Sequence, residues 1–471
     1  MTILQRLAGA SPTYVEKRGE NFLVAAHPKP VTVHRGTVRL LLDARRDFLS
    51  AWRASDYRSR TRAVRILGRQ IVLVNDPADI KYVMATRHEN FERKSPQMRR
   101  SLEPLLGDGL FISDGKTWAA RRPLVADIVH KTRVPDFGKV MEAATVEMAA
   151  RWATLPAGTE LNALAEMAKL TAAIIARAVF GNDLSAEAAF EVVDGFTRYQ
   201  RLIDSVNLGY FLGFDEGLPA FRGVRLKREV RRIHTVIDRV VSEHLDGRGD
   251  AASMLDLLIR RQEKSPGLGL GRDALRNEAA TIFMAGHETT AATLTWAWYL
   301  LGSAPWAEAR LLAEIRAVCG DRTPTVADVP KLAYATAVIE ETLRLYPPVP
   351  ILARQPKAAD RVGEIDVEPA ALVLVVPWLL HRSPDLWKRP TRFRPERFLK
   401  DQRPIPYSYI PFAIGPRICA GLQFGLTEAV LCLAILAGRF AVRVREGYPV
   451  HPTQRLTLRP EGGLPVTVTP R

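Results

Sequence analysis

The chain has 471 residues, of which 47% are hydrophobic and 25% are charged, and its formal net charge is +16. These proportions are typical of a globular protein with a large core and exclude a disordered or fibrous chain. The cysteines, Cys319, Cys419 and Cys432, show no paired spacing. This pattern argues against a disulfide framework and indicates a reducing compartment.

The basic residues are scattered along the chain in short pairs such as Arg99-Arg100 and Arg231-Arg232. Basic motifs interleaved with aromatic residues are absent, so we expect no nucleic-acid partner. Dispersed arginines are usually an ordinary solvated surface. Residues 1–17 contain no long apolar run, and we therefore expect neither a membrane anchor nor a signal peptide.

Residues 1–40 show no regular pattern, and their prolines predict extended chain. We therefore expect a lead-in segment over residues 1–40 and one domain over residues 41–471. A helix is predicted over residues 37–52. Residues 63–74 alternate apolar and polar around a glycine, which predicts a β-hairpin, and the Asn-Asp-Pro that follows predicts a helix start.

Residues 91–111 include Pro96, Pro104, Gly107 and Gly109, which predicts irregular chain. Loops of this length in a compact domain are usually functional, so we expect this one to face a bound ligand. A surface connection is the alternative.

Helices are predicted next, with Trp118 and Arg122 sharing one face of the first. Further helices are predicted over residues 140–152, 161–180, 186–202 and 223–245. Residues 207–214, between the last two, are rich in glycine and aromatic residues. As an apolar segment, they are expected to pack on the core.

A long apolar helix is predicted over residues 272–302, with Ala285-Gly286-His287-Glu288-Thr289-Thr290 at its centre. Glycine inside a helix costs about 1 kcal/mol relative to alanine, so Gly286 indicates either a flat ligand or a crowded helix interface. Thr289 can bond the carbonyl of Ala285 or offer its hydroxyl to a bound molecule. Glu288 can supply or orient protons. A zinc helix is excluded because Ala291 occupies the position of the second histidine.

Glu341 and Arg344 can pair on a helix predicted over residues 332–346, which two prolines end. An apolar strand follows over residues 349–352. Residues 456–466 predict a terminal hairpin whose tip, around Leu464, is expected to reach a ligand pocket.

The stretch Phe412-Ala-Ile-Gly415-Pro-Arg417-Ile-Cys419-Ala-Gly421 precedes an apolar helix predicted over residues 422–436. Cys419 would lie at a helix N-terminus, where free N–H groups favour a thiolate. Gly415 can take a positive φ, Gly421 admits a flat group, and Phe412 can cover the sulfur. A thiolate on haem iron promotes cleavage of the O–O bond. The alternative is a buried structural cysteine.

This stretch resembles the signature of the cytochrome P-450 superfamily of haem-thiolate monooxygenases, soluble bacterial type. The Ala285 to Thr290 segment resembles the family's Ala-Gly-x-Asp/Glu-Thr motif, and Pro395-Glu396-Arg397-Phe398 resembles the segment that joins its Glu-x-x-Arg pair. The resemblance extends from about residue 60 to the C-terminal end. It implies a mostly α fold with a small β region, in one domain that encloses haem b. It also implies that residues 207–214 cover the substrate entrance, as an alternative to packing on the core.

The resemblance also implies roles for individual residues. Cys419 is the expected iron ligand, and Thr289 with Glu288 is expected to handle protons. Other residues are expected to contact the haem or hold its propionates: Trp118, Arg122, Arg354, Arg417, Phe412, Gly421 and Ala285. Glu341, Arg344 and Arg397 are expected to form a buried structural triad. The expected substrate pocket comprises Phe111, Phe283, Ala285, Val349, Ile351 and Leu464.

The implied activity is insertion of one oxygen atom from O2 into an apolar substrate, by hydroxylation or epoxidation. Electrons are expected from a ferredoxin-type donor with its reductase, guided by basic residues such as Arg121. We expect a cytoplasmic monomer. The alternatives are a peroxide-driven hydroxylase of the same fold, which Glu288-Thr289 disfavours, and a non-catalytic haem-binding sensor.

Overall fold

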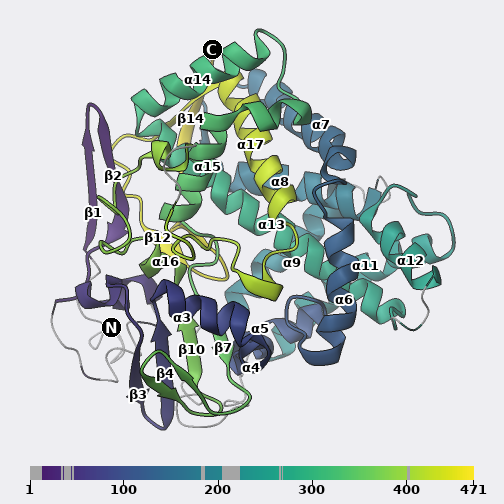
Figure 1. The fold of residues 1–471 in the computed structure, drawn as a ribbon. Coiled ribbons are helices and arrows are strands. Elements are labelled where there is room, and N and C mark those ends of the chain that lie inside the picture. Colours follow the sequence, from purple (N-terminus) through teal and green to yellow (C-terminus); the bar gives the residue numbers. More distant parts are fainter. Residues whose placement is uncertain are drawn as a thin grey trace.

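The computed structural model describes residues 13–32, 36, 44, 47–181, 186–203, 223–264, 267, 269–399 and 404–471. Helix α13 (Arg272–Gly302) runs through the middle of the molecule, and the other elements are arranged around it (Figure 1). Most of its side chains are buried, which explains why its sequence is apolar on all sides. Its observed bounds confirm the predicted helix.

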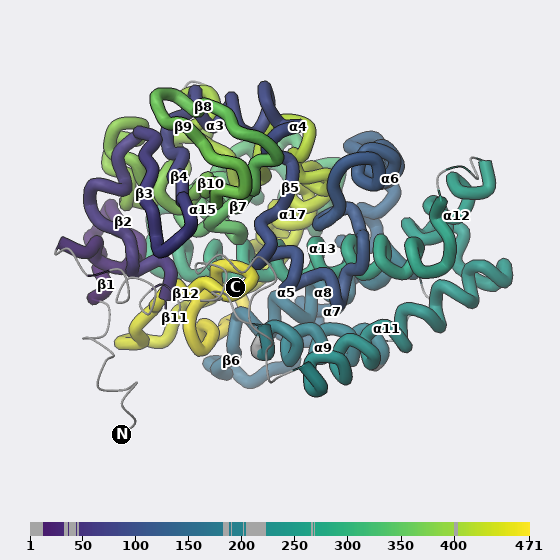
Figure 2. Tube along the Cα trace, turned by 90° about the horizontal axis from the view of Figure 1, so that it is seen from below, coloured from purple at the N-terminus to yellow at the C-terminus, as the bar shows by residue number. Residues whose placement is uncertain are grey.

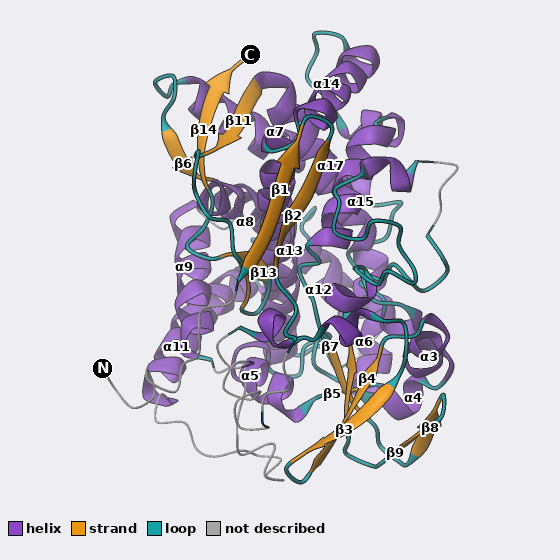
Figure 3. Ribbon diagram, turned by 90° about the vertical axis from the view of Figure 1, so that its left-hand side faces the viewer, coloured by secondary structure: helices purple, strands orange, loops and turns teal. Residues whose placement is uncertain are grey.

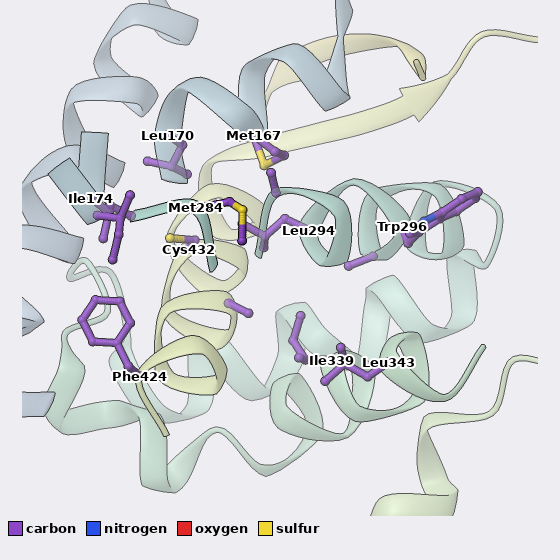
Figure 4. Packing of buried hydrophobic residues seen from close by; sticks show 14 of the residues in the cluster. Met167, Leu170, Ile174, Met284, Leu294, Trp296, Ile339, Leu343, Phe424 and Cys432 are labelled. Atoms are coloured by element: carbon purple, nitrogen blue, oxygen red, sulfur yellow. The ribbon is translucent and has the colours of Figure 1, made fainter. Parts of the chain in front are cut away.

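Four helices form the core around α13, in which α8, α15 and α17 contact α13 and α7 contacts α8 and α17. Figure 4 shows Met167 and Leu170 of α8 close to Met284 of α13 and Cys432 of α17. Helix α17 is long and apolar enough to cross a membrane, but 61% of it is buried inside the protein, including residues 428–437. The helices are α7 (Val134–Ala153), α8 (Ala163–Phe180), α15 (Ala333–Leu345) and α17 (Leu422–Arg439).

A second helical layer consists of α9 (Ala186–Leu202), α11 (Gly223–Leu245) and α12 (Met254–Lys264). Helix α11 packs against α9, α13 and α12, and its buried residues follow one helical face. Figure 2 shows α11 and α12 at the end of the molecule away from strands β1 and β2.

The largest sheet has five strands in the order β3-β4-β10-β7-β5 and lies at one end of the helical body (Figure 3). Strand β10 is parallel to β4 and antiparallel to β7, and β5 pairs with β7 so that Lys94 lies opposite Arg354. The predicted hairpin over residues 63–74 is confirmed as β3 and β4. The strands are β3 (Arg62–Ile66), β4 (Arg69–Val74), β5 (Arg93–Lys94), β7 (Leu352–Gln355) and β10 (Leu372–Val375).

Shorter helices connect these layers. They are the 3-10 helices η1 (Phe48–Ala51), η2 (Ala54–Tyr57), η6 (Val326–Lys331), η7 (Pro395–Phe398) and η8 (Gly415–Arg417), the π-helical turn η3 (Tyr82–Thr86), and α3 (Pro77–Lys81), α4 (His88–Phe91), α5 (Pro96–Leu106), α6 (Gly115–Ile128), α14 (Pro305–Cys319) and α16 (Pro377–Leu380).

The N-terminal part corrects the predicted lead-in segment. Strands β1 (Tyr14–Gly19) and β2 (Phe22–Pro28) form an antiparallel hairpin along the helical body (Figure 3). The Ala26 N–H donates to Tyr299 Oη at 3.0 Å, and Tyr346 Oη donates to the Ala26 carbonyl at 2.8 Å. These residues therefore belong to the domain, and a boundary at residue 40 is wrong.

The prediction of irregular chain over residues 91–111 is also wrong, because α5 occupies its middle. The Ser95 hydroxyl accepts from the Met98 N–H at 3.4 Å, and Pro96 takes the first helical position. A proline there starts a helix instead of breaking one. The predicted loop over residues 207–214 lies outside the described residues, as does most of the helix predicted over residues 37–52.

The predicted terminal hairpin is wrong in its pairing. Strand β13 (Leu458–Pro460) pairs with β12 (Pro452–Gln454), whereas β14 (Pro465–Pro470) pairs with two other strands. Those two are β11 (Phe440–Val444) and β6 (Glu160–Asn162), and the remaining pair of strands is β8 (Asp360–Val362) and β9 (Ile365–Val367). Sequence alternation identified the strands but not their partners.

Candidate active site

A mostly apolar cavity of about 690 Å³ lies beside the middle of α13. Its lining comes from α6, α13, the start of α17, the chain before β7, and the turn between β12 and β13. Cys419, Trp118, Arg122, Arg354 and Arg417 all line this cavity. Residues separated by three hundred positions in the sequence are therefore brought to one site.

Cys419 lies just before α17 and faces the cavity. Its N–H donates to the Phe412 carbonyl at 2.9 Å. Gly415 has φ of +72°, and a Cβ there would lie 2.2 Å from the Met84 carbonyl oxygen, so this position requires glycine. The predicted positive φ is thus confirmed. Burial raises the pKa of the Cys419 thiol, while the Gly421 N–H and the Arg122 guanidinium oppose that rise.

Four cations, which we call the basic group, line one side of the cavity: Lys94, Arg122, Arg354 and Arg417. Arg417 donates to the Ser113 carbonyl at 2.9 Å and pairs with Glu92 at 3.2 Å. Its Cζ lies 4.4 Å from the centre of the Trp118 ring. Its Nε is buried without a partner among the described residues.

Positive charge exceeds negative charge in the basic group. Lys94 and Arg354 form no ion pair with any residue that the structure describes, and Glu92 is shared between Arg417 and Lys357. Burial lowers the pKa of Arg354 to about 10, helped by the charge of Arg417. Burial, together with Arg354 and Arg417, also lowers the pKa of Lys94 well below its usual value.

Sequence reasoning missed Lys94. It reaches the site because β5 places it opposite Arg354, and this pairing between distant segments leaves no local signal. A Lys-containing pair of residues between two short helices gives no reason to expect a buried cation.

These residues fit haem b. Its two propionates would supply the anions that the basic group lacks, and the unpartnered Arg417 Nε gives one donor for them. Cys419 provides a sulfur ligand at the cavity wall, and no side chain fills the space in front of Gly421, where a Cβ would meet no atom within 4 Å.

The central segment of α13 faces the same cavity. Thr289 Oγ1 donates to the Ala285 carbonyl at 2.7 Å, which is the first of the two arrangements considered for it. A Cβ on Gly286 would lie 2.7 Å from Ile175 Cδ1 of α8. Close packing of two helices is therefore sufficient to require this glycine, as one of the two predicted explanations has it, and Gly286 also lines the cavity.

Glu288 is buried and held by side chains of other elements. It accepts from Thr457 Oγ1 at 2.8 Å and from Gln200 Nε2, and Arg459 Nη1 lies 3.9 Å away. Burial raises the pKa of Glu288, and these partners oppose the rise. The carboxyl group thus connects α13 with α9 and with the turn before β13.

Glu341, Arg344 and Arg397 are brought together, and none of the three lines the cavity. Arg344 is fully buried and makes two bonds to the Glu341 carboxylate, at 2.7 and 2.8 Å. It also donates to the carbonyls of His381 and Pro390, both at 2.7 Å. Arg397 Nε lies 3.4 Å from Glu341. Every nitrogen of the Arg344 guanidinium has a partner.

Two expected pocket residues do not line the cavity. Phe283 is buried against Phe180, with ring centres 6.1 Å apart, and Leu464 is fully buried beside α8, where its carbonyl accepts from the Ala163 N–H. Their apolar character reflects core packing. Other residues do line the cavity: the expected Phe111, Ala285, Val349 and Ile351, with Gln454, Arg455, Leu456 and Thr457 from the β12–β13 turn.

Arg121 does not form part of an exposed basic surface. It is 6% exposed and binds Asp108 at 2.8 Å and Glu278 at 3.1 Å. Its expected role in guiding an electron donor is therefore wrong, because its charge is neutralised inside the protein.

A helical domain that presents a cysteine to a buried cavity, beside cations with no protein anion to match them, has the arrangement of a haem-thiolate protein. The chain belongs to the cytochrome P450 family, whose model matches residues 57–467. It is a monooxygenase with haem b as its cofactor, and the predicted fold class and family are confirmed.

The relatives span bacteria, plants and animals. Cyclooctatin synthase of Streptomyces melanosporofaciens is 35% identical over 77% of this chain and 78% of its own length. A cytokinin hydroxylase of Arabidopsis thaliana is 30% identical over 82% of this chain and 76% of its own length. The heme domain of cytochrome P450DA shares the fold, with a TM-score of 0.79, 23% identity, and coverage of 93% of this chain and 94% of that one.

Proposed function

We propose that this protein inserts one oxygen atom of O2 into a C–H or C=C bond of an apolar small molecule, with electrons from a ferredoxin-type donor and its reductase. The observation that carries this proposal is the mostly apolar wall of the cavity that Thr289 also lines, which includes Phe111, Val349, Ile351 and Leu456. Such a wall binds by burial of apolar surface and excludes water from the reacting bond.

Cys419 and the basic group hold the cofactor in this proposal. Haem, when bound, supplies the iron on which dioxygen is activated. Cys419 would supply its sulfur ligand. Arg122, Arg354 and Arg417 would bind the propionates as charge-assisted donors, with Lys94 as a fourth donor, and Trp118 packs against Arg417. Phe412, Gly421 and Ala285, which also line the cavity, would contact the cofactor.

Thr289 and Glu288 move the protons that the reaction consumes. Thr289 holds a proton at Oγ1, which rotates from the Ala285 carbonyl toward the cavity. Burial raises the pKa of Glu288, which favours the protonated carboxyl group, and its bonds to Thr457 and Gln200 orient that group. Glu341, Arg344 and Arg397 act as a structural triad.

Spectroscopy and turnover test the proposal. The reduced protein with carbon monoxide should show the strongly red-shifted Soret band of a thiolate ligand, and Cys419→Ser should lose it. A panel of terpenoids, steroids, fatty acids and aromatic compounds should include at least one that shifts ferric haem to high spin. That compound should gain an atom from labelled dioxygen when a ferredoxin, its reductase and NADPH are added. A Soret band typical of histidine ligation would contradict the proposal.

The same assay separates the other two functions. A peroxide-driven hydroxylase would turn over with hydrogen peroxide alone, whereas a haem sensor would consume no oxygen with any ligand. The intact Glu288 and Thr289 pair favours the oxygen-dependent reaction.

We further propose a cytoplasmic monomer. The free thiols of Cys319 and Cys432 are both buried, which is compatible with a reducing compartment. Sedimentation at equilibrium should give the mass of one chain, and fractionation of the source cells should recover the protein with the cytoplasm. Recovery with membranes would contradict this.

A further inference from the structure

Residues 107–114, which we call the cavity loop, connect α5 with α6 and form part of the cavity wall. Leu110 and Phe111 of this loop line the cavity. Glu278 of α13 does not line it, and its side chain is fully buried behind the loop. A fully buried carboxyl group requires partners, and these partners belong to the cavity loop and to α6.

The Glu278 carboxylate accepts from the Leu110 N–H, at 3.0 and 3.2 Å to its two oxygens, and from Arg121 at 3.1 Å. Arg121 in turn binds both oxygens of Asp108, at 2.9 and 2.8 Å, and the Asp108 carbonyl at 2.7 Å. Asn277 adds a bond to Asp108 at 3.1 Å. The loop is thus fastened to α13 at two of its residues.

The loop also approaches α13 more closely than side chains would allow. A Cβ on Gly109 would lie 2.2 Å from Thr281 Oγ1, and one on Gly107 would lie 2.1 Å from Asn277 Nδ2. Gly107 has φ of +54°, which further favours glycine. These glycines let the Leu110 N–H reach Glu278.

The other end of the loop contacts the basic group. The Ser113 carbonyl accepts from Arg417 at 2.9 Å, and Lys94 Nζ lies 4.7 Å from the centre of the Phe111 ring. Asp114 pairs with Arg99 at 2.7 Å. Phe111 therefore lies between an anchor on α13 and an anchor on the residues that fit the cofactor.

We propose that Glu278 is a positioning residue that fixes Leu110 and Phe111 through the Leu110 N–H and Arg121, and thereby determines which ligands the cavity accepts. Glu278 touches neither ligand nor cofactor. The inference rests on the proposed function for its meaning in catalysis, but the fastening of the loop can be measured without turnover.

The test compares Glu278→Ala and Glu278→Gln in the full-length, haem-loaded protein. Glutamine keeps an oxygen for the Leu110 N–H but removes the charge that Arg121 binds. The matched control is Glu308→Ala, because Glu308 is also a buried carboxylate bound by two arginines, Arg443 and Arg471, but does not line or support the cavity.

Imidazole and 4-phenylimidazole serve as probes, since both bind haem iron through nitrogen but only the second needs the shape of the wall. Glu278→Ala should change the Kd of 4-phenylimidazole about tenfold and that of imidazole by less than about twofold. The Leu110 amide should lose protection from hydrogen exchange. Glu278→Gln should retain that protection in part, and Glu308→Ala should leave both Kd values and the loop unchanged.

Unchanged Kd values and unchanged Leu110 protection in Glu278→Ala would overturn the proposal. An equal change in Glu308→Ala would also overturn it, because the effect would then be general destabilisation. If the wild-type protein lacked a thiolate spectrum, the proposed function would fail, but the exchange of the Leu110 amide would still report whether Glu278 fastens the loop.

Discussion

Two groups of buried charges, the triad of Glu341, Arg344 and Arg397 and the basic group, differ in how their charges are balanced. In the first, Glu341 accepts from Arg344 and Arg397, and the remaining guanidinium hydrogens of Arg344 bind carbonyls. In the second, the basic group, Arg417 pairs with Glu92, which also binds Lys357, whereas Lys94 and Arg354 form no ion pair with any residue that the structure describes. The first group is complete within the chain, whereas the second is not.

The difference separates a structural role from a binding role. A buried ion group whose partners are all supplied by the protein can only stabilise or specify the fold. A buried group with excess cations is costly until an anion arrives, so part of the binding energy of that anion compensates for the cost. Substitutions in the two groups should therefore affect different quantities.

The largest effect is expected from Glu341→Ala, which leaves the fully buried Arg344 without its carboxylate. The free energy of unfolding should fall by about 3–5 kcal/mol, in the apoprotein as well as in the haem-loaded protein. Urea unfolding of both forms measures it. Glu368→Ala, which removes an exposed ion pair with Arg65, is the control and should cost less than about 1 kcal/mol. Equal decreases in the free energy of unfolding of Glu341→Ala and Glu368→Ala would contradict the structural role of the buried triad.

Arg417→Ala should act on haem retention instead. Loss of a charge-assisted donor should speed haem transfer to apomyoglobin about thirtyfold, corresponding to about 2 kcal/mol. The free energy of unfolding of the apoprotein should change little, since Arg417 is only partly neutralised there. Arg443→Ala, which breaks the pair with Glu308, is the control and should retain haem like the wild type. If Arg417→Ala lost haem as slowly as the wild type, Arg417 would not be a propionate donor.

Lys94→Met should have opposite effects on the two forms of the protein. Burial already disfavours the charged form of Lys94, so an apolar side chain of similar length should stabilise the apoprotein by about 1 kcal/mol. Haem transfer should become about fivefold faster, because one propionate partner is lost. Lys357→Met, which removes the other partner of Glu92, serves as the control. A destabilised apoprotein would show that Lys94 is balanced by the protein itself.

Local sequence patterns predicted the parts of the site that are local in space. The positive φ of Gly415, the position of Cys419 before α17 and the pairing of Glu341 with Arg344 all arise within short segments. The full extent of α13 was predictable for the same reason, since its hydrophobic pattern is continuous.

Parts that depend on pairing between distant segments could not be predicted. Lys94 enters the site because its strand pairs it with Arg354. Arg121 can be buried because Glu278, 157 positions later in the chain, accepts a hydrogen bond from its guanidinium group. The sequence left two explanations open for Gly286, because its close neighbour, Ile175, comes from another helix. In each case the deciding contact is a tertiary one, which intrinsic propensity does not encode.

Another buried acid, Glu428, sharpens the contrast. Glu428 of α17 is 1% exposed, no arginine binds it, and its Oε1 has no partner among the described residues. Burial raises its pKa to about 8, opposed by a hydrogen bond from Thr290. This carboxyl group should therefore be protonated at neutral pH.

The folded protein should consequently bind one more proton at Glu428 than the unfolded chain does, between the ordinary glutamate range and about pH 8. Its contribution to stability is present at low pH and is lost as pH rises, by at most about 1.4 kcal/mol per pH unit. Glu428→Gln removes this titration, so the variant should become relatively more stable than the wild type as pH increases from about 5 to 8. Urea unfolding across that range measures the difference. Parallel curves would mean that Glu428 is ionised in the folded state and has a cation partner, as Glu341 has.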